Sequence, residues 1–258
     1  MKILLTNDDG IRAKGLHSLA SSLTRRSEFE VYVVAPDRER SACGHGITLH
    51  EPIYVEEVKF DVPGVKGAWA ISGTPADCTK IGIEVLVKGK PDMVLSGVNR
   101  GPNLGTDILY SGTVSGAMEG CVHGIPSIAV SLADFSSDEF DFAAEVGAKL
   151  ALLLRDVDMS PNLFNVNVPA LPPSEIRGVA VTRMGQTLYR DRFEGQIDQS
   201  GRNCFWLTGD LIATENADDT DVKAVEKGFV SITPLHLNLT DGPLISIISV
   251  WPLDQLLL

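Results

Sequence analysis

The sequence has few cysteines and a deficit of basic residues. Its four cysteines are widely spaced, form no C-x-x-C pair and are too few for a disulfide scaffold in a chain of 258 residues, so we expect reduced thiols. The 22 Lys and Arg residues against 34 Asp and Glu residues give a formal net charge of −12. Such a charge argues against a nucleic-acid polymer or an anionic membrane surface as the main partner, because both would be repelled at long range.

The chain also lacks an apolar run of about 18 residues that could span a bilayer. It opens with MKILLTND, a strand pattern without the basic stretch, long apolar region and small-residue cleavage site of a signal peptide. These absences predict a cytoplasmic protein with no membrane partner. A small phosphate ester stays compatible with the acidic charge, because a metal ion and a few backbone amides dominate the field at short range.

Short apolar runs alternate with segments of helical period from the first residue to about Pro169. This alternation is typical of βαβ units and predicts an α/β fold with a mostly parallel sheet and flanking helices. The length suits one large domain with an appendage. The expected strands are 3–5, 31–34, 93–95, 127–130 and 164–168, and the expected helices are 16–23, the stretch after Gly112, and 140–154.

Between about residues 179 and 227 the alternation of strand and helix patterns gives way to β-hairpin and turn patterns. TRMGQTLYRDRF and RNCFWLTG resemble the strands of a β-hairpin, and TENADDTD is an acidic, turn-rich loop. GFVSITPL returns to an apolar β pattern, which predicts that the chain rejoins the main sheet. We therefore expect one domain over residues 1–258 with a β-hairpin excursion at about 179–227. The apolar tail SVWPLDQLLL is expected to pack on something, with a partner subunit as the candidate.

The first candidate site is TNDDG at residues 6–10, directly after the opening strand. Ligands of open parallel sheets bind outside the carboxyl ends of the strands, so the adjacent carboxylates of Asp8 and Asp9 are well placed for a hard cation. Two neighbouring anions also need a counter-charge. Taken alone, so short a string is more typical of a solvated turn.

The second candidate is APDRERSACGHGIT, which follows the second strand and contains the hydroxyl of Ser41. A serine hydroxyl is a neutral oxygen ligand suited to Mg²⁺, and the nearby Arg38 and Arg40 could meet phosphate oxygens. His45 and His50 are interpreted as loop or packing residues, because they show no H-x-x-H or H-x-H spacing.

The third candidate is SGVNRGPNLGTDILYSGTVSGA at residues 96–117. It begins at a strand end, where the amide oxygen of Asn99 could complete a site with the two aspartates and the serine. An all-oxygen set favours Mg²⁺ or Mn²⁺ over Zn²⁺. Ser111, Gly112 and Thr113 open an expected helix whose free N–H groups could hold a phosphate, although the glycines fit no phosphate-loop signature and could form a simple turn.

Two further strings have mainly structural interpretations. In SGTPADC, Thr74 is expected to cap a helix with Pro75 at the first helical position, which explains the string without catalysis. His236 follows the late β-rich run and could donate a proton, but a lone histidine is more often structural.

Taken together and in order, TNDDG, APDRERSACGHGIT, SGTPADC, SGVNRGPNLGTDILYSGTVSGA, GIPSIA and AVEKGFVSITPL resemble the SurE survival-protein nucleotidases. The resemblance runs from Met1 to about His236. It implies a Rossmann-like core, a β-hairpin used in homodimer or homotetramer formation, and a divalent-metal-dependent 5′/3′-nucleotidase acting on nucleoside monophosphates, with short polyphosphate as a further substrate of some members. The implied metal ligands are Asp8, Asp9, Ser41 and Asn99, and the implied phosphate-binding residues are Asn103, Ser111, Gly112 and Thr113.

The mechanism expected from these residues is attack of an activated water in line with the leaving alcohol, with Asp8 or Asp9 orienting that water. A haloacid-dehalogenase-type phosphatase fits less well, because its phosphorylated aspartate belongs to a D-x-D string and this chain has Asn7-Asp8-Asp9. A nucleotide-binding regulatory protein without turnover is the main alternative, although adjacent carboxylates repel a phosphate unless a metal intervenes. An oxidoreductase lacks support, since the dinucleotide fingerprint is missing.

Overall fold

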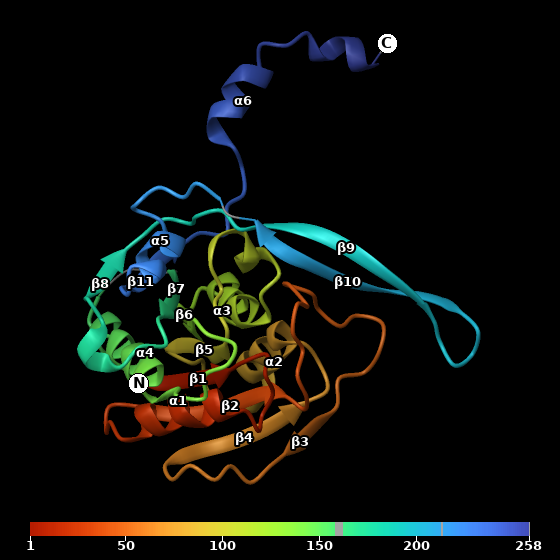
Figure 1. Cartoon of the computed structure of the whole chain (residues 1–258). Coiled ribbons are helices and arrows are strands. Elements are labelled where there is room, and N and C mark those ends of the chain that lie inside the picture. The colour runs from red at the N-terminus through yellow and green to blue at the C-terminus, as the bar shows by residue number, and fades with distance from the viewer. Residues whose placement is uncertain (158–161, 213, 258) are drawn as a thin grey trace.

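A large mixed sheet forms the centre of the molecule (Figure 1). The computed structural model describes residues 1–157, 162–212 and 214–257, and within them nine strands join in the order β3-β4-β2-β1-β5-β6-β7-β11-β8. The parallel part contains β4 (Val65–Ile71), β2 (Glu30–Pro36), β1 (Lys2–Thr6), β5 (Met93–Arg100), β6 (Ser127–Leu132) and β7 (Leu163–Val168). At the edges, β3 (Val55–Glu57) runs antiparallel to β4, β11 (Val230–Leu235) runs antiparallel to β7, and β8 (Val179–Val181) runs parallel to β11.

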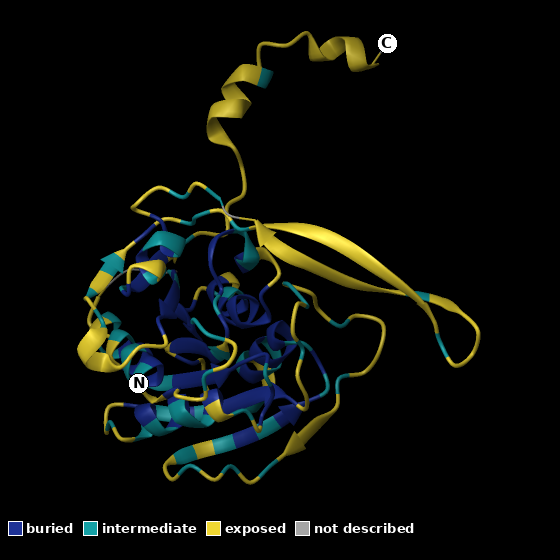
Figure 2. Ribbon diagram, viewed as in Figure 1, coloured by how far each residue is buried: buried dark blue, intermediate teal, exposed yellow. Residues whose placement is uncertain are grey.

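The central strands are continuous apolar runs because both faces of the sheet are covered. In β1 the side chains of Ile3, Leu4 and Leu5 are fully buried, although they point alternately to opposite faces. The burial colouring shows the same pattern across the centre of the sheet (Figure 2). The predicted α/β class with a mostly parallel sheet is therefore confirmed, and so is the expected return of GFVSITPL to the main sheet as β11.

Two pairs of helices cover the two faces of the sheet. α1 (Lys14–Thr24) packs with α4 (Asp141–Leu154) on one face, and α2 (Pro75–Ile81) packs with α3 (Gly112–Val122) on the other (Figure 1). α2 continues into the π-helix η1 (Gly82–Leu86). The predicted cap of α2 is present, because the Thr74 side chain accepts a hydrogen bond from the Asp77 N–H and the Asp77 carboxylate accepts one from the Thr74 N–H.

A line of glycines lets α3 lie unusually close to the strands beneath it. Gly112, Gly116 and Gly120 recur every four residues and therefore share one face of the helix. A Cβ atom at Gly120 would lie 2.5 Å from the Ser127 Oγ and 2.6 Å from the Val94 Cγ2. The small-residue composition of this helix is therefore a packing requirement, and it brings the first turn of α3 to the carboxyl end of β1.

A two-stranded hairpin and the C-terminal segment extend from the body (Figure 1). The hairpin pairs β9 (Leu188–Ile197) with β10 (Asn203–Ile212), and both strands are exposed along nearly their whole length (Figure 2). Within residues 179–227 the structure also has β8, which pairs with β11, and α5 (Asp221–Glu226), which packs on β11 and β7. The tail forms α6 (Gly242–Ile248) and η4 (Leu253–Leu257), and its last residue lies outside the described part.

The remaining short elements are the 3₁₀ helices η2 (Gly105–Leu109) and η3 (Pro173–Glu175). None of the helices in the described ranges is long and apolar enough to cross a membrane.

The glycine face of α3 yields a stability test. We expect Gly120→Val to lower the free energy of unfolding by about 2 kcal/mol, because the added side chain overpacks against β5 and β6. Val122→Ala, at a position of the same helix that is 55% exposed, is the matched control and should change it by less than about 0.5 kcal/mol. Equal urea midpoints for wild type and Gly120→Val would contradict the close packing of α3.

Candidate functional site

The loop after β1 places Asp8 at the carboxyl end of the central strands. The side chain is only 5% exposed, and one carboxylate oxygen accepts a hydrogen bond from the Thr113 hydroxyl at the start of α3. Burial, opposed by the hydrogen bond from Thr113 and reinforced by the nearby charge of Asp9, raises the pKa of Asp8 to about 6. The ionised carboxylate is thus held in a position where it lacks a full counter-charge.

Asp9 lies beside the end of β5. Its Oδ2 accepts a hydrogen bond from the Arg100 N–H at 3.2 Å, and Arg100 directly follows Asn99 in the chain. Burial and the negative charge of Glu39 raise the pKa of Asp9, while the Arg100 N–H and guanidinium lower it. Among the described residues no Lys, Arg or His side chain forms an ion pair with Asp8 or Asp9. The pair is therefore an anionic centre without a basic side-chain partner among the described residues.

The loop after β2 brings Ser41 to the same edge of the sheet. The Arg40 N–H donates to the Asp8 carbonyl oxygen at 2.8 Å, and the Arg40 guanidinium donates to the Ser72 carbonyl oxygen. Ser41 itself is exposed, and its hydroxyl donates to the Glu39 carboxylate at 2.7 Å. Arg40 thus anchors the loop, and its guanidinium is already engaged by a carbonyl group.

Asn99 completes the set of predicted metal ligands. Its Nδ2 donates to the Gly101 carbonyl oxygen at 2.9 Å, which leaves the amide Oδ1 to act as an acceptor or ligand. The structure therefore gathers the loops of all four predicted ligands at one edge of the sheet, with the Ser41 side chain turned toward Glu39. Within the described ranges no group of three or more His, Cys, Asp and Glu residues is arranged to hold a metal ion. A cation here would need the neutral oxygens as well as the two carboxylates.

The predicted phosphate-binding residues fall into two groups. Ser111 caps α3, because its Oγ accepts from the Val114 N–H at 3.0 Å. Gly112 lies against the carboxylate of Asp8, where a Cβ would stand 2.8 Å from Oδ2. The Thr113 hydroxyl donates a hydrogen bond to the Asp8 carboxylate, and the Thr113 N–H also lowers the pKa of that carboxyl group. The first turn of α3 thus directly adjoins the carboxylate pair.

Asn103 belongs to a buried polar network on β6 and β7. Its N–H donates to the Asn167 Oδ1 at 2.8 Å, its Nδ2 donates to the Ser131 Oγ at 2.7 Å, and its carbonyl oxygen accepts from Asn165 and Asn167. Asn165, Asn167 and Ser131 are fully buried. This network fixes the loop that leads from β5 to α3.

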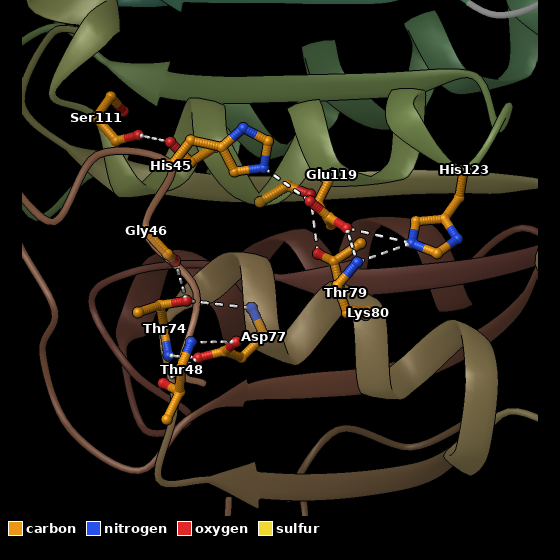
Figure 3. A network of polar contacts seen from close by, with 12 residues as sticks. His45, Gly46, Thr48, Thr74, Asp77, Thr79, Lys80, Ser111, Glu119 and His123 are labelled. Atoms are coloured by element: carbon orange, nitrogen blue, oxygen red, sulfur yellow. Dashed lines mark hydrogen bonds and ion pairs between the residues drawn. The ribbon is translucent and has the colours of Figure 1, made fainter. Parts of the chain in front are cut away.

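Sequence reasoning missed these supporting residues and also Glu119. The two asparagines stand at alternate positions of the apolar strand LFNVNV, so they share one face, and buried amides in such a strand are a signal of an internal polar partner. Glu119 is an acidic residue within the small-residue helix α3, and it binds His45 and Lys80 (Figure 3). His45 lies in the loop after β2 and packs against Glu119, which agrees with its interpretation as a loop or packing residue. His50 is exposed.

The structure places His236 away from this site within the chain. It follows β11, which runs antiparallel to β7, so Leu235 pairs with Leu163 at the amino end of that strand. The carboxylate pair lies at the opposite edge of the sheet. His236 is exposed there and does not contact Asp8 or Asp9 in the same chain.

Comparison with known proteins gives a consistent assignment. The family described as "Survival protein SurE" matches residues 3–191. The chain is 47% identical to the 5′-nucleotidase SurE of Heliobacterium modesticaldum, covering 97% of this chain and 92% of the relative, and 50% identical to that of Gloeobacter violaceus, covering 94% and 92%. It superimposes on the crystal structure of the SurE protein from Aquifex aeolicus with a TM-score of 0.79 and 40% identity, covering 96% of this chain and 98% of that one. The chain therefore belongs to the SurE family.

Proposed function

We propose that the protein is a divalent-metal-dependent 5′-nucleotidase that hydrolyses nucleoside monophosphates to nucleoside and phosphate. The relatives named above carry the name 5′-nucleotidase SurE. The observation that carries the proposal is the pair of adjacent carboxylates, Asp8 and Asp9, next to the first turn of α3. A phosphate would be repelled by these carboxylates alone, whereas it is attracted once a cation is held between them.

The residues at the carboxylate pair fit Mg²⁺ or Mn²⁺. The donor set of Asp8, Asp9, Ser41 and Asn99 contains only oxygen, and the Asn99 Oδ1 is left available by the hydrogen bond of its amide nitrogen. The buried charge of Asp8 also calls for a cation, since burial disfavours its ionised form. A bound divalent ion would neutralise phosphate charge and lower the pKa of a water molecule.

The first turn of α3 supplies the proposed phosphate side of the site. Ser111 and the backbone N–H of Gly112, together with Asn103, would hold phosphate oxygens, because helix N–H groups in the first turn lack partners inside the helix. Thr113, also predicted as a phosphate-binding residue, keeps its hydroxyl on Asp8 and orients that carboxylate. Phosphate would thus be held beside the carboxylate of Asp8.

Asp9 and Asp8 would orient the attacking water. Only Oδ2 of Asp9 accepts a hydrogen bond from the described residues, so its other oxygen can accept one from water. Attack on phosphorus in line with the ester oxygen then releases the nucleoside alcohol. Hydrolysis of 3′-monophosphates and short polyphosphate, and a cytoplasmic location, belong to the same proposal.

The direct test is phosphate release from 5′- and 3′-nucleoside monophosphates with Mg²⁺, with Mn²⁺ and after chelation. Wild type should release phosphate in a chelator-sensitive manner, and Asp9→Asn should lose at least about 100-fold in kcat because it removes a ligand and a water-orienting group. Asp61→Asn, which changes an exposed carboxylate that pairs with Lys59, is the control and should keep wild-type activity. Nucleotide binding without any turnover would favour the regulatory-protein alternative.

Removal of the buried charge should stabilise the metal-free protein. The folded-state pKa of Asp8, about 6, lies above the ordinary aspartate value of 3.8, so the ionised carboxylate opposes folding, with its full effect above about pH 6. We expect Asp8→Asn in excess chelator to raise the free energy of unfolding at pH 8 by about 2 kcal/mol, and this gain should vanish below about pH 4, where both states are protonated. Chemical denaturation of both proteins at the two pH values measures it, and a variant less stable than wild type at pH 8 would contradict the assignment.

We further propose that the hairpin and tail form the interface of a homodimer or homotetramer. Phe193 and Leu207 face each other across β9 and β10 and are 69% and 62% exposed, so a single chain leaves this apolar area uncovered. Phe193→Asp combined with Leu207→Asp should reduce the mass in light scattering toward 27.7 kDa, whereas Glu194→Gln should keep the wild-type mass. A wild-type protein that is monomeric at micromolar concentration would refute this interface.

A further inference from the structure

Glu119 is a buried carboxylate that joins three segments of the chain. It lies on α3, and its side chain is only 5% exposed. It accepts a hydrogen bond from the His45 Nε2 at 2.8 Å and from the Lys80 Nζ at 2.6 Å, and it contacts the His123 Nε2 at 3.2 Å (Figure 3). His45 comes from the loop after β2, Lys80 from α2 and His123 from the end of α3.

The charge of Glu119 is well compensated in this position. The hydrogen bond from His45 and the contacts with Lys80 lower the pKa of Glu119 to about 2, although burial alone would raise it. A buried carboxylate with several hydrogen-bonded partners is geometrically demanding, because the loss of any partner leaves an unsatisfied charge. Such a group can therefore fix its partners in one arrangement.

The segment that Glu119 holds through His45 is the loop that carries Ser41. On one side of Ser41, the Arg40 N–H is bonded to Asp8. On the other side, the Gly44 N–H donates to the Tyr110 carbonyl oxygen at 3.0 Å, just before the cap of α3. His45 follows directly, and its side chain binds the buried carboxylate of Glu119. The four residues from Ser41 to Gly44 thus connect a hydrogen bond to Asp8 with a hydrogen bond to the segment that precedes α3.

The contact between α2 and α3 depends only in part on Glu119, whose carboxylate pairs with Lys80 of α2. The Thr79 hydroxyl of α2 donates to the Gly116 carbonyl oxygen of α3 at 2.8 Å, and the small face of α3 packs nearby. Thr48 anchors the far end of the same loop on Asp77 by two further hydrogen bonds. What Glu119 adds is therefore the position of the loop near Ser41, relative to the helix whose first turn adjoins Asp8.

We infer that Glu119 is a positioning residue which, through His45, holds the Ser41 loop against α3 and so sets the geometry of the metal-binding oxygens. This inference rests on the proposed function, because it assumes that Ser41 and Asp8 share a cation. Among the described residues, Glu119 forms its hydrogen bonds with His45, Lys80 and His123 and with none of the four proposed metal ligands. Its effect is transmitted by one hydrogen bond to the ring of His45.

The test measures Mn²⁺ binding directly, by the electron paramagnetic resonance signal of free Mn²⁺, in the full-length protein without nucleotide. Glu119→Gln keeps the shape of the side chain but removes its charge, and we expect its Kd for Mn²⁺ to rise about tenfold, as is typical for loss of a supporting partner. His45→Gln, at a side chain that is 30% exposed, should give a similar rise, and the double variant should not exceed the single ones by more than about twofold. Glu84→Gln, which changes an exposed carboxylate on the other side of His123, is the matched control and should bind Mn²⁺ as wild type does.

The outcomes separate this inference from the proposed function. Wild-type Mn²⁺ affinity in folded Glu119→Gln and in His45→Gln would overturn the positioning role while leaving the nucleotidase proposal intact. Failure of wild type itself to bind Mn²⁺ would overturn the proposed metal site. If Glu119→Gln does not fold, His45→Gln decides, because its side chain is partly exposed and Glu119 keeps its ion pair with Lys80 in that variant. A loss of melting temperature in both variants without a change in Kd would mark the network as structural only.

Discussion

The geometry of the candidate site depends on two adjacent carboxylates, Asp8 and Asp9, at the end of the central strand. Asp8 is buried, its pKa is raised, and the residues described around it supply hydrogen bonds from α3 but no ion pair. An arrangement of this kind opposes folding in the absence of a cation, since ionised groups lose hydration on burial. Its persistence at a strand end is explained if the site is built for a metal ion. The loops of Ser41 and Asn99 would then supply neutral oxygen ligands to this ion.

Helix α3 connects the parts of the site. Its glycine face allows close contact with the strands, its first turn reaches Asp8, and Glu119 further along the helix holds the loop that carries Ser41. The loop before α3 is held through Asn103, which forms hydrogen bonds with the buried Asn167 of β7. Rigid support of this kind is what a metal and phosphate site requires, because small displacements of ligands reduce both affinity and rate.

Much of the fold could be predicted because its central strands are buried on both faces and therefore read as apolar runs between helical segments. β4 was missed, since Lys66 and Gly67 interrupt its apolar pattern, and β8 is a short, largely exposed strand. The loops of Asp8, Asp9, Ser41 and Asn99 could be placed together by topology alone, because parallel strands end at the same edge. The network of Glu119 could not, because its partners lie far apart in the sequence, and the distance of His236 from the site follows from the antiparallel direction of β11.

We expect the carboxylate pair and its neutral neighbours to hold one divalent cation. Anomalous diffraction from a crystal of the protein grown with Mn²⁺ tests this expectation. We predict one strong anomalous peak within coordination distance of the Asp8 and Asp9 carboxylates and the Asn99 Oδ1, with the Ser41 hydroxyl turned from Glu39 toward the ion. Well-ordered Asp8 and Asp9 without such a peak at saturating Mn²⁺, or a peak bound elsewhere in the chain, would contradict it.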